Sequence, residues 1–228
     1  MTMFKYALRR GFFSPVALIL NCALPLVLMI VMRGDGLGEA GLYLIAMAVM
    51  FGGFFMAKGI QNDRMQGVLI RILAGPVTMR DYLIQNLLGA AIPMFGLSIA
   101  IGILGVILHS WTLVFAIGIT VCYAFLAITS IGLSFVWSSL FKSKESSSAA
   151  FSTVMTLVSF LSGMFIPLRL LPDALFYIGT MFPAHWASRA IQDLIDYGRL
   201  TQMYGISILI MALFTAVFIL LGAKRRLI

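Results

Sequence analysis

The chain has 228 residues, of which 61% are hydrophobic and only 11% are charged. Its mean hydropathy of +1.05 excludes an ordinary soluble domain and places it among polytopic membrane proteins. The net charge of +8 would suit a nucleic-acid-binding protein. The basic residues, however, collect between apolar runs, which is typical of membrane topology and not of a nucleic-acid surface.

Six apolar runs are long enough to cross a bilayer as helices, because about 20 residues span the hydrocarbon core. Residues 1–13 precede them and form an amphipathic pattern, which predicts a helix lying in the headgroups. A cleaved signal peptide is the alternative for this stretch, although the apolar run that follows is long enough to span. The sequence thus predicts an all-α polytopic membrane protein with one transmembrane domain, whose spans are 14–32, 41–60, 81–108, 111–141, 147–166 and 203–223.

The lysines and arginines orient these six spans. Both termini lie on one side, together with residues 61–80 and the loop at Lys142. Twelve of the 16 lysines and arginines fall on that side, and the loops on the opposite side hold the other four: Arg33, Arg169, Arg189 and Arg199. The positive-inside rule therefore predicts that both termini are cytoplasmic.

A polar segment, 61–80, separates the second and third spans. A charge at mid-bilayer costs roughly 3 kcal/mol, so this segment is expected in water or at the headgroups. Thr78, with Asp81 three residues later, predicts the cap of the helix that follows. Before it, apolar residues recur at the spacing of one helix face: Met65, Val68, Leu69 and Ile72. We therefore predict a short cytoplasmic helix that couples the chain to a partner through this apolar face.

Residues 167–200 form a re-entrant segment in this prediction, on the outer side of the membrane. It is predicted to contain two short helices broken at Pro183, Leu171–Phe182 and Ala184–Asp196, of which the first is too short to span and the second too charged. Both are expected to be half-inserted or to lie on the surface. His185 beside Trp186 is interpreted as an interfacial anchor.

Titratable residues do not gather as they do in catalytic or metal sites. Gly52–Lys58 departs from a phosphate-binding loop, because Ala57 replaces the required glycine and Gly59 the Ser/Thr. Cys22 and Cys122 both lie in apolar runs and are interpreted as buried hydrophobes. We predict a non-catalytic chain with no cofactor or metal of its own, which depends on another subunit for energy.

The spans carry almost no charge, which disfavours an ion-coupled carrier. Their hydroxyl groups have two interpretations: hydrogen bonds between helices, or the lining of a permeation route. Met and Phe side chains would suit a hydrophobic or amphipathic cargo on such a route. The candidate pathway residues are Asn21, Met50, Phe54, Ser152, Thr156, Ser159 and Ser162.

Two stretches resemble those of ABC-2-type transporter permeases. NDRMQGVLIRILAGPVTMRDYLIQNLL resembles the region after the family's second span, and FLSGMFIPLRLLPDALFYIGTMFPAHW resembles the family's second hallmark. The matching residues are Asp63, Arg64, Gly67, Leu69, Leu73, Gly75, Pro76 and Arg80 in the first stretch, and Ser162, Gly163, Pro167, Pro172 and Pro183 in the second. Val68 and Ile70 depart from the pattern, since the family usually has Thr and Glu there.

The resemblance implies the transmembrane subunit of an ATP-binding cassette exporter in the bacterial plasma (inner) membrane. It also implies a second copy or a paralogous permease, and separate cytoplasmic ATPase subunits that bind ATP and Mg. The cargo would be a hydrophobic or amphipathic small molecule or peptide, as in multidrug or peptide efflux. The residues expected to contact the ATPase are Asp63, Arg64, Met65, Gly67, Val68, Leu69, Ile72, Leu73, Pro76, Lys142, Lys144 and Glu145.

Two alternatives stay open at this point. One is an exporter of the same type that moves a lipid-linked saccharide. The other is a membrane scaffold or immunity-type protein, whose short helix would bind a partner that is not an ATPase.

Overall fold

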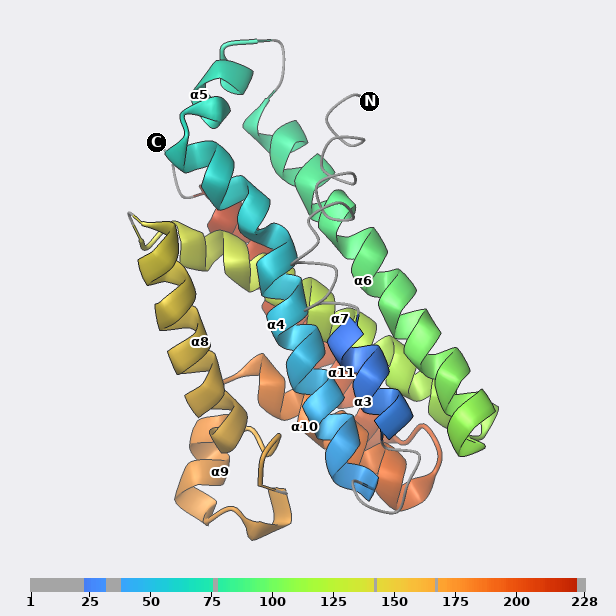
Figure 1. Cartoon of the computed structure of the whole chain (residues 1–228). Helices are drawn as coiled ribbons and strands as arrows, with labels where there is room; N and C mark the ends of the chain where they lie inside the picture. Colours follow the sequence, from blue (N-terminus) through green and yellow to red (C-terminus); the bar gives the residue numbers. More distant parts are fainter. Residues whose placement is uncertain (1–22, 32–37, 76–77, 142, 167, 225–228) are drawn as a thin grey trace.

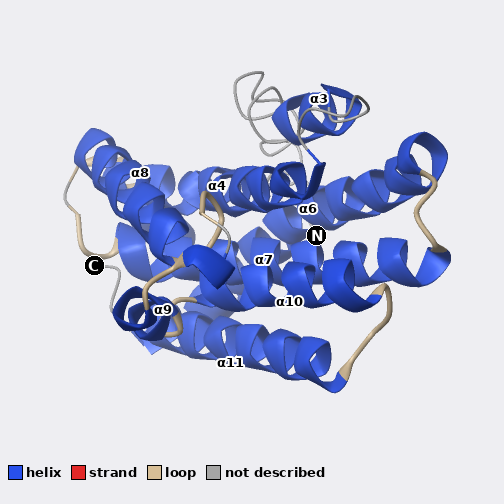
Figure 2. Cartoon of the chain, turned by 90° about the horizontal axis from the view of Figure 1, so that it is seen from below, coloured by secondary structure: helices blue, strands red, loops and turns tan. Residues whose placement is uncertain are grey.

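The computed structural model describes residues 23–31, 38–75, 78–141, 143–166 and 168–224 (Figure 1). Every regular element in these ranges is helical, as the sequence predicted (Figure 2). The predicted helix at 1–13 and most of the predicted first span, including Asn21, lie outside the described residues. The α-helices are α3 (Leu24–Val31), α4 (Gly38–Met65), α5 (Val68–Leu73), α6 (Met79–His109), α7 (Leu113–Ser138), α8 (Lys144–Leu161), α9 (Asp173–Gly179), α10 (Pro183–Tyr197) and α11 (Gln202–Lys224), and a 3-10 turn, η2, occupies Leu168–Leu170.

Four of the described helices are long and apolar enough to cross a membrane. The candidate segments are Gly38–Asp63, Ile84–His109, Leu113–Ser138 and Gln202–Gly222. They support a multi-pass membrane protein, while the count of six spans stays a prediction. The predicted fifth span coincides with α8, which has 18 residues but does not qualify, because its first turns (KESSS) are polar.

The centre of the bundle is α7, which contacts α4, α6, α10 and α11. Helices α4 and α7 run parallel. Hydroxyl groups four residues apart on α7 donate hydrogen bonds to carbonyls four residues apart on α4, in the same chain direction. Ser130 donates to the Met50 carbonyl, and Ser134 donates to the Phe54 carbonyl at 3.4 Å. Gly53 lies between these contacts, and a Cβ atom there would be 2.8 Å from the Ala127 carbonyl oxygen. Small residues and hydroxyls thus bring the two helices together, as expected where lipid removes the hydrophobic drive.

The helix directions define two ends of the molecule. Helices α4, α7 and α11 run one way, while α6 and α8 run the other way (Figure 1). One end therefore holds α5 and the turn between α7 and α8, and we call it the α5 end. The opposite end, the α9 end, holds η2, α9 and the tight turn at Ser110, whose φ of 55° lies in the left-handed region.

The second helix of the predicted re-entrant segment does not lie on a surface, one of its two expected placements, while the half-inserted placement stays a prediction. It does begin at Pro183, which occupies its first turn, and it ends at Gly198 in the left-handed conformation. However, α10 does not lie on a surface but packs against α7, α11 and α4. The reason is a face of small and apolar side chains, all buried: Ala184, Ala187, Ser188, Ile191 and Leu194. Of the charged residues that suggested exposure, Asp196 is exposed and Arg189 half-buried, whereas Asp193 is buried and accepts from the Thr201 hydroxyl.

His185 was interpreted as an interfacial anchor, and this interpretation is wrong. Its side chain is only 1% exposed and makes an edge contact with the Phe176 ring. It also packs on Gly179, where a Cβ atom would lie 3.0 Å from Nδ1. The histidine is thus part of the packing between α9 and α10.

The tight contact of α4 with α7 can be tested with a pair of glycine variants. Gly53→Leu should force the helices apart, because overpacking a close contact typically costs about 1–3 kcal/mol or more. Gly96→Leu is the control, since no atom lies within 4 Å of its added Cβ position. We expect a melting temperature in detergent several degrees lower for Gly53→Leu and unchanged or higher for Gly96→Leu. Equal melting temperatures would contradict the packing described here.

Candidate functional site

The connection between α4 and α6 contains two helical pieces where the sequence predicted one. α4 continues beyond the predicted span to Met65, and α5 begins only at Val68. Between them Gly67 adopts a φ of 66°, the left-handed conformation that glycine tolerates and that ends helices. The periodicity of the apolar residues is therefore real, but it spans a break and not one continuous helix.

A buried hydrogen bond closes this connection at its base. The Tyr82 hydroxyl on α6 donates to Asp63 Oδ2 on α4 at 2.7 Å, and the two residues are only 1% and 5% exposed. A buried carboxylate needs such donors, because an unpaired charge away from water is costly. The start of α6 is fixed as predicted, since Thr78 Oγ1 accepts from the Asp81 amide at 3.2 Å. The ends of α4 and α6 are thus tied together on either side of α5.

The face of α5 that was expected to dock on a partner is turned inward. Leu69 is only 2% exposed, and Ile72 packs against the chain's own core. By contrast, Ile70 is 65% exposed. We call four of the exposed residues of this connection the α5 outward face: Gln66, Ile70, Arg71 and Ala74. Leu69 and Asp63 therefore hold the segment in place, and the surface available to a partner is this outward face.

Other predicted coupling residues are only partly described. Gly67 and Val68 are half-buried, and Glu145 is exposed on the first turn of α8. That turn is capped by Ser143, whose hydroxyl accepts from the Ser146 amide at 3.1 Å. It lies at the same end of the molecule as α5 (Figure 1). The side chains of Arg64, Met65, Leu73 and Lys144, and the whole of Pro76 and Lys142, lie outside the described residues.

The predicted pathway residues do not come together around one cavity in the described part of the chain. Met50 and Phe54 are buried, and the Phe54 ring stacks on Phe151 of α8. The hydroxyls of Thr156 and Ser159 each donate to carbonyls of their own helix, at 2.7 Å. Of the remaining candidates, Ser152 is half-buried and Ser162 is fully buried. These observations favour helix packing for this set.

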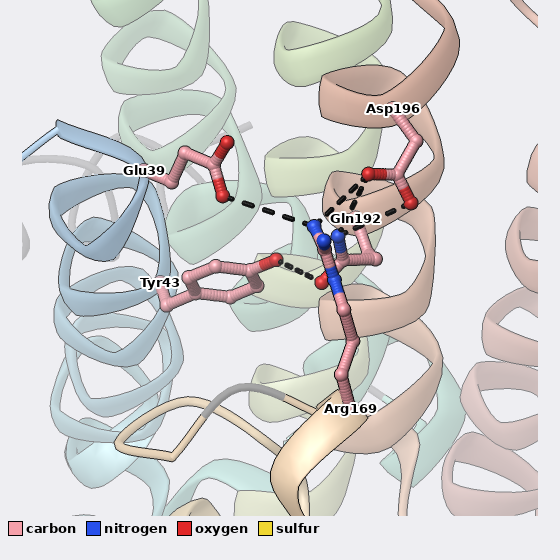
Figure 3. Close-up of polar contacts among 5 residues, drawn as sticks. All are labelled: Glu39, Tyr43, Arg169, Gln192 and Asp196. Carbon is pink, nitrogen blue, oxygen red and sulfur yellow. Dashed lines mark hydrogen bonds and ion pairs between the residues drawn. The ribbon is translucent and has the colours of Figure 1, made fainter.

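A polar cluster at the α9 end was not predicted from the sequence (Figure 3). Its centre is Arg169 of η2, whose guanidinium lies 3.0 Å from Asp196 Oδ1 and 4.0 Å from Glu39 Oε2. Beside it, the Tyr43 hydroxyl of α4 donates to Gln192 Oε1 of α10 at 3.0 Å. We call these five residues the Arg169 cluster. They connect the first turns of α4 with α10 and η2.

The sequence carries only a weak signal for this cluster. Gln192 and Asp196 stand four residues apart, and the Gln192 amide does donate to Asp196 Oδ1 at 3.1 Å within one helix. No spacing relates Glu39 or Tyr43 to Arg169, because those contacts join distant segments. Exposed ion pairs of this kind contribute at most about 1 kcal/mol each, so they do not determine the fold.

Comparison with protein families gives a match over most of the chain. The family model described as "ABC-2 family transporter protein" matches residues 38–224, from the start of α4 to the end of α11. The matched region contains both the α5 connection and the Arg169 cluster. None of the curated proteins matches the chain significantly.

We expect the Asp63–Tyr82 hydrogen bond to keep the α5 connection rigid. Tyr82→Phe leaves Asp63 without this donor, which costs roughly 1–3 kcal/mol for a buried group. We expect faster deuterium exchange in residues 66–75 and a lower melting temperature. Tyr197→Phe is the matched control, because Tyr197 is exposed and its hydroxyl makes no hydrogen bond to the described residues. Exchange as slow as in the wild type would show that the bond does not hold the segment.

The burial of His185 predicts a dependence of stability on pH. Burial, with a smaller effect of the nearby Arg189 charge, lowers the pKa of His185 to about 4. The unfolded chain has a histidine pKa near 6.5 and so binds more protons between these values, and stability falls as the pH drops through 6.5 towards 4. At pH 5 the loss should be on the order of 2 kcal/mol. His185→Gln should flatten the fall in melting temperature between pH 7.5 and 5, and an unchanged slope would contradict this assignment.

Proposed function

The chain belongs to the ABC-2 family of transporter proteins, and from this membership we propose that it is the permease subunit of an ATP-driven exporter. In this proposal a separate ATPase subunit binds ATP and Mg, and its movements switch the permease between inward-open and outward-open states. The observation that carries the proposal is the α5 connection. The buried Leu69 and the Asp63–Tyr82 bond hold it against the rest of the protein, and Ile70 and Arg71 are exposed on its surface.

The geometry of the connection suits the transfer of motion. α4 has 28 residues, which corresponds to a length of roughly 42 Å. α6, with 31 residues, starts at the other side of α5. Because Asp63 and Tyr82 tie the two helices together, a force on α5 would act on both as levers. A partner that contacts α5 differently in two states would thereby shift the bundle between two arrangements.

The orientation of the chain follows in this proposal from its basic residues. The α5 end carries the exposed Arg71, and in the sequence Lys142 stands between α7 and α8, whose neighbouring ends lie there; this end would face the cytoplasm by the positive-inside rule. Both termini would then be cytoplasmic, in the bacterial plasma membrane. The ATPase would meet the permease at α5 and make a smaller contact near Glu145. A second copy or a paralogous permease would complete the transporter.

A small apolar pocket favours a hydrophobic or amphipathic cargo, of which it would hold an apolar part and not a whole drug-like compound or small peptide. Its volume of about 240 Å³ is below the roughly 300–1,000 Å³ of sites for drug-sized ligands, and it lies beside α3 and α4. Its lining is almost entirely apolar, and the flexible or aromatic side chains in it adapt to varied shapes. They include Leu28, Met47, Phe51, Phe55 and Phe165.

The docking role of the α5 outward face is tested by placing a charge at its apolar centre. Ile70→Asp should leave the folded permease in the membrane, because this side chain is mostly exposed. Loss of a central contact residue lowers affinity by about tenfold or more, so co-purification of a co-expressed ABC ATPase and ATP-driven uptake into inverted vesicles should both fall. Met181→Asp is the matched control, because Met181 is 73% exposed at the opposite end.

The outcomes separate the open readings. Wild-type transport by Ile70→Asp would contradict the docking role of α5. Recovery of the permease only with a partner that lacks ATPase activity would favour the scaffold or immunity-type protein. ATP-driven movement of a lipid-linked saccharide, with no movement of drug-like compounds or peptides, would support the proposed exporter but contradict the proposed cargo.

A further inference from the structure

A second pocket lies at the α9 end, beside the Arg169 cluster. Its volume is about 600 Å³, which is within the range of sites for drug-sized ligands. Three arginines from three separate segments line it: Arg169 of η2, Arg189 of α10 and Arg199 of the loop before α11. Two aspartates, Asp193 and Asp196, line it as well, so three arginines against two aspartates leave a formal charge of +1, which favours an anion.

The acidic residues of the pocket are already engaged by other groups. The Asp193 carboxylate accepts from the Thr201 hydroxyl, and Asp196 pairs with Arg169 at 3.0 Å. Arg189 lies over the Phe176 ring, 5.7 Å from its centre, and forms no ion pair with a described residue. Arg199 likewise has no carboxylate partner in the described ranges. Two cations in the pocket are therefore free to pair with a ligand.

We propose that this pocket binds the phosphate head group of an anionic phospholipid. Guanidinium groups bind phosphate through parallel hydrogen bonds, and their planar fork matches its oxygens. The pocket is much larger than a phosphate ion alone needs, so it suits a head group with its glycerol. Two of its lining side chains, Tyr197 and Met203, are largely apolar and exposed, and an acyl chain can lie along them. Free phosphate would leave these two side chains unused.

The position of the pocket agrees with this ligand. It lies where α10 and α11 meet, at the end of a candidate membrane span that begins at Gln202. Head groups are found at this level of a membrane protein, next to the ends of its apolar helices. The site is independent of ATP-driven transport, so it can be tested on the purified permease whether or not an ATPase partner is known.

The test compares lipids on the full chain purified in a neutral detergent. We expect phosphatidylglycerol to bind at least fivefold more tightly than zwitterionic phosphatidylcholine, as measured by native mass spectrometry, and to raise the melting temperature. The double variant R189Q/R199Q should lose this preference. Arg199→Gln alone, in an exposed loop where folding is not at risk, should weaken it several-fold. Arg71→Gln removes an exposed cation at the opposite end and should keep the preference unchanged.

Three results would overturn the proposal. One is equal binding of the two lipids by the wild type. Another is a preference for phosphatidylglycerol that survives in both Arg199→Gln and the folded double variant. The third is stabilisation by soluble glycerol 3-phosphate as strong as that by phosphatidylglycerol, which would assign the pocket to a soluble phosphate and not to a lipid.

Discussion

The close contact between α4 and α7 is the constraint on which the rest of the structure depends. In a bilayer, apolar helices gain little by leaving lipid for one another, so association rests on packing and hydrogen bonds. Gly53 removes the side chain where the backbones are nearest, and Ser130 and Ser134 donate to α4 carbonyls on either side of it. This contact fixes the position of a helix that carries α5 at one end and part of the Arg169 cluster at the other.

The two ends of α4 are held in different ways, and this difference suits a moving part. At the α5 end the buried Asp63–Tyr82 bond ties α4 to α6, so these helices move together. At the α9 end α4 meets α10 through the exposed Arg169 contacts and the single Tyr43–Gln192 bond. The exposed Arg169 ion pairs are each worth about 1 kcal/mol or less, and the Tyr43–Gln192 bond is partly buried. A displacement of α4 relative to α10 therefore breaks weak contacts at one end while the strong link at the other end stays intact.

Local signals in the sequence predicted the helices well and their surroundings poorly. The Thr78 cap and the helix start at Pro183 follow from chemistry within a few residues, and both are present. The apolar periodicity around Leu69 correctly marks a buried face, but periodicity does not say whether a helix buries that face on its own chain or on a partner. The charges on α10 suggested a surface helix, since small residues such as Ala187 give no strong apolar signal. The Arg169 cluster joins segments far apart in the chain, so no local pattern could reveal it.

Ile70 stands where the family usually has Glu, and its exposure implies a different kind of contact with a partner. A carboxylate at this position would bind a partner through charge, and salt would screen that contact. Ile70 instead offers an apolar side chain between polar neighbours, and complete burial of an isoleucine is worth about 1.5–3 kcal/mol. About two thirds of the side chain is still exposed, so much of this stabilisation is left for a partner. If α5 docks on an ATPase subunit as proposed, the surface that receives it should therefore present an apolar hollow opposite Ile70, with acidic groups placed to meet Arg71.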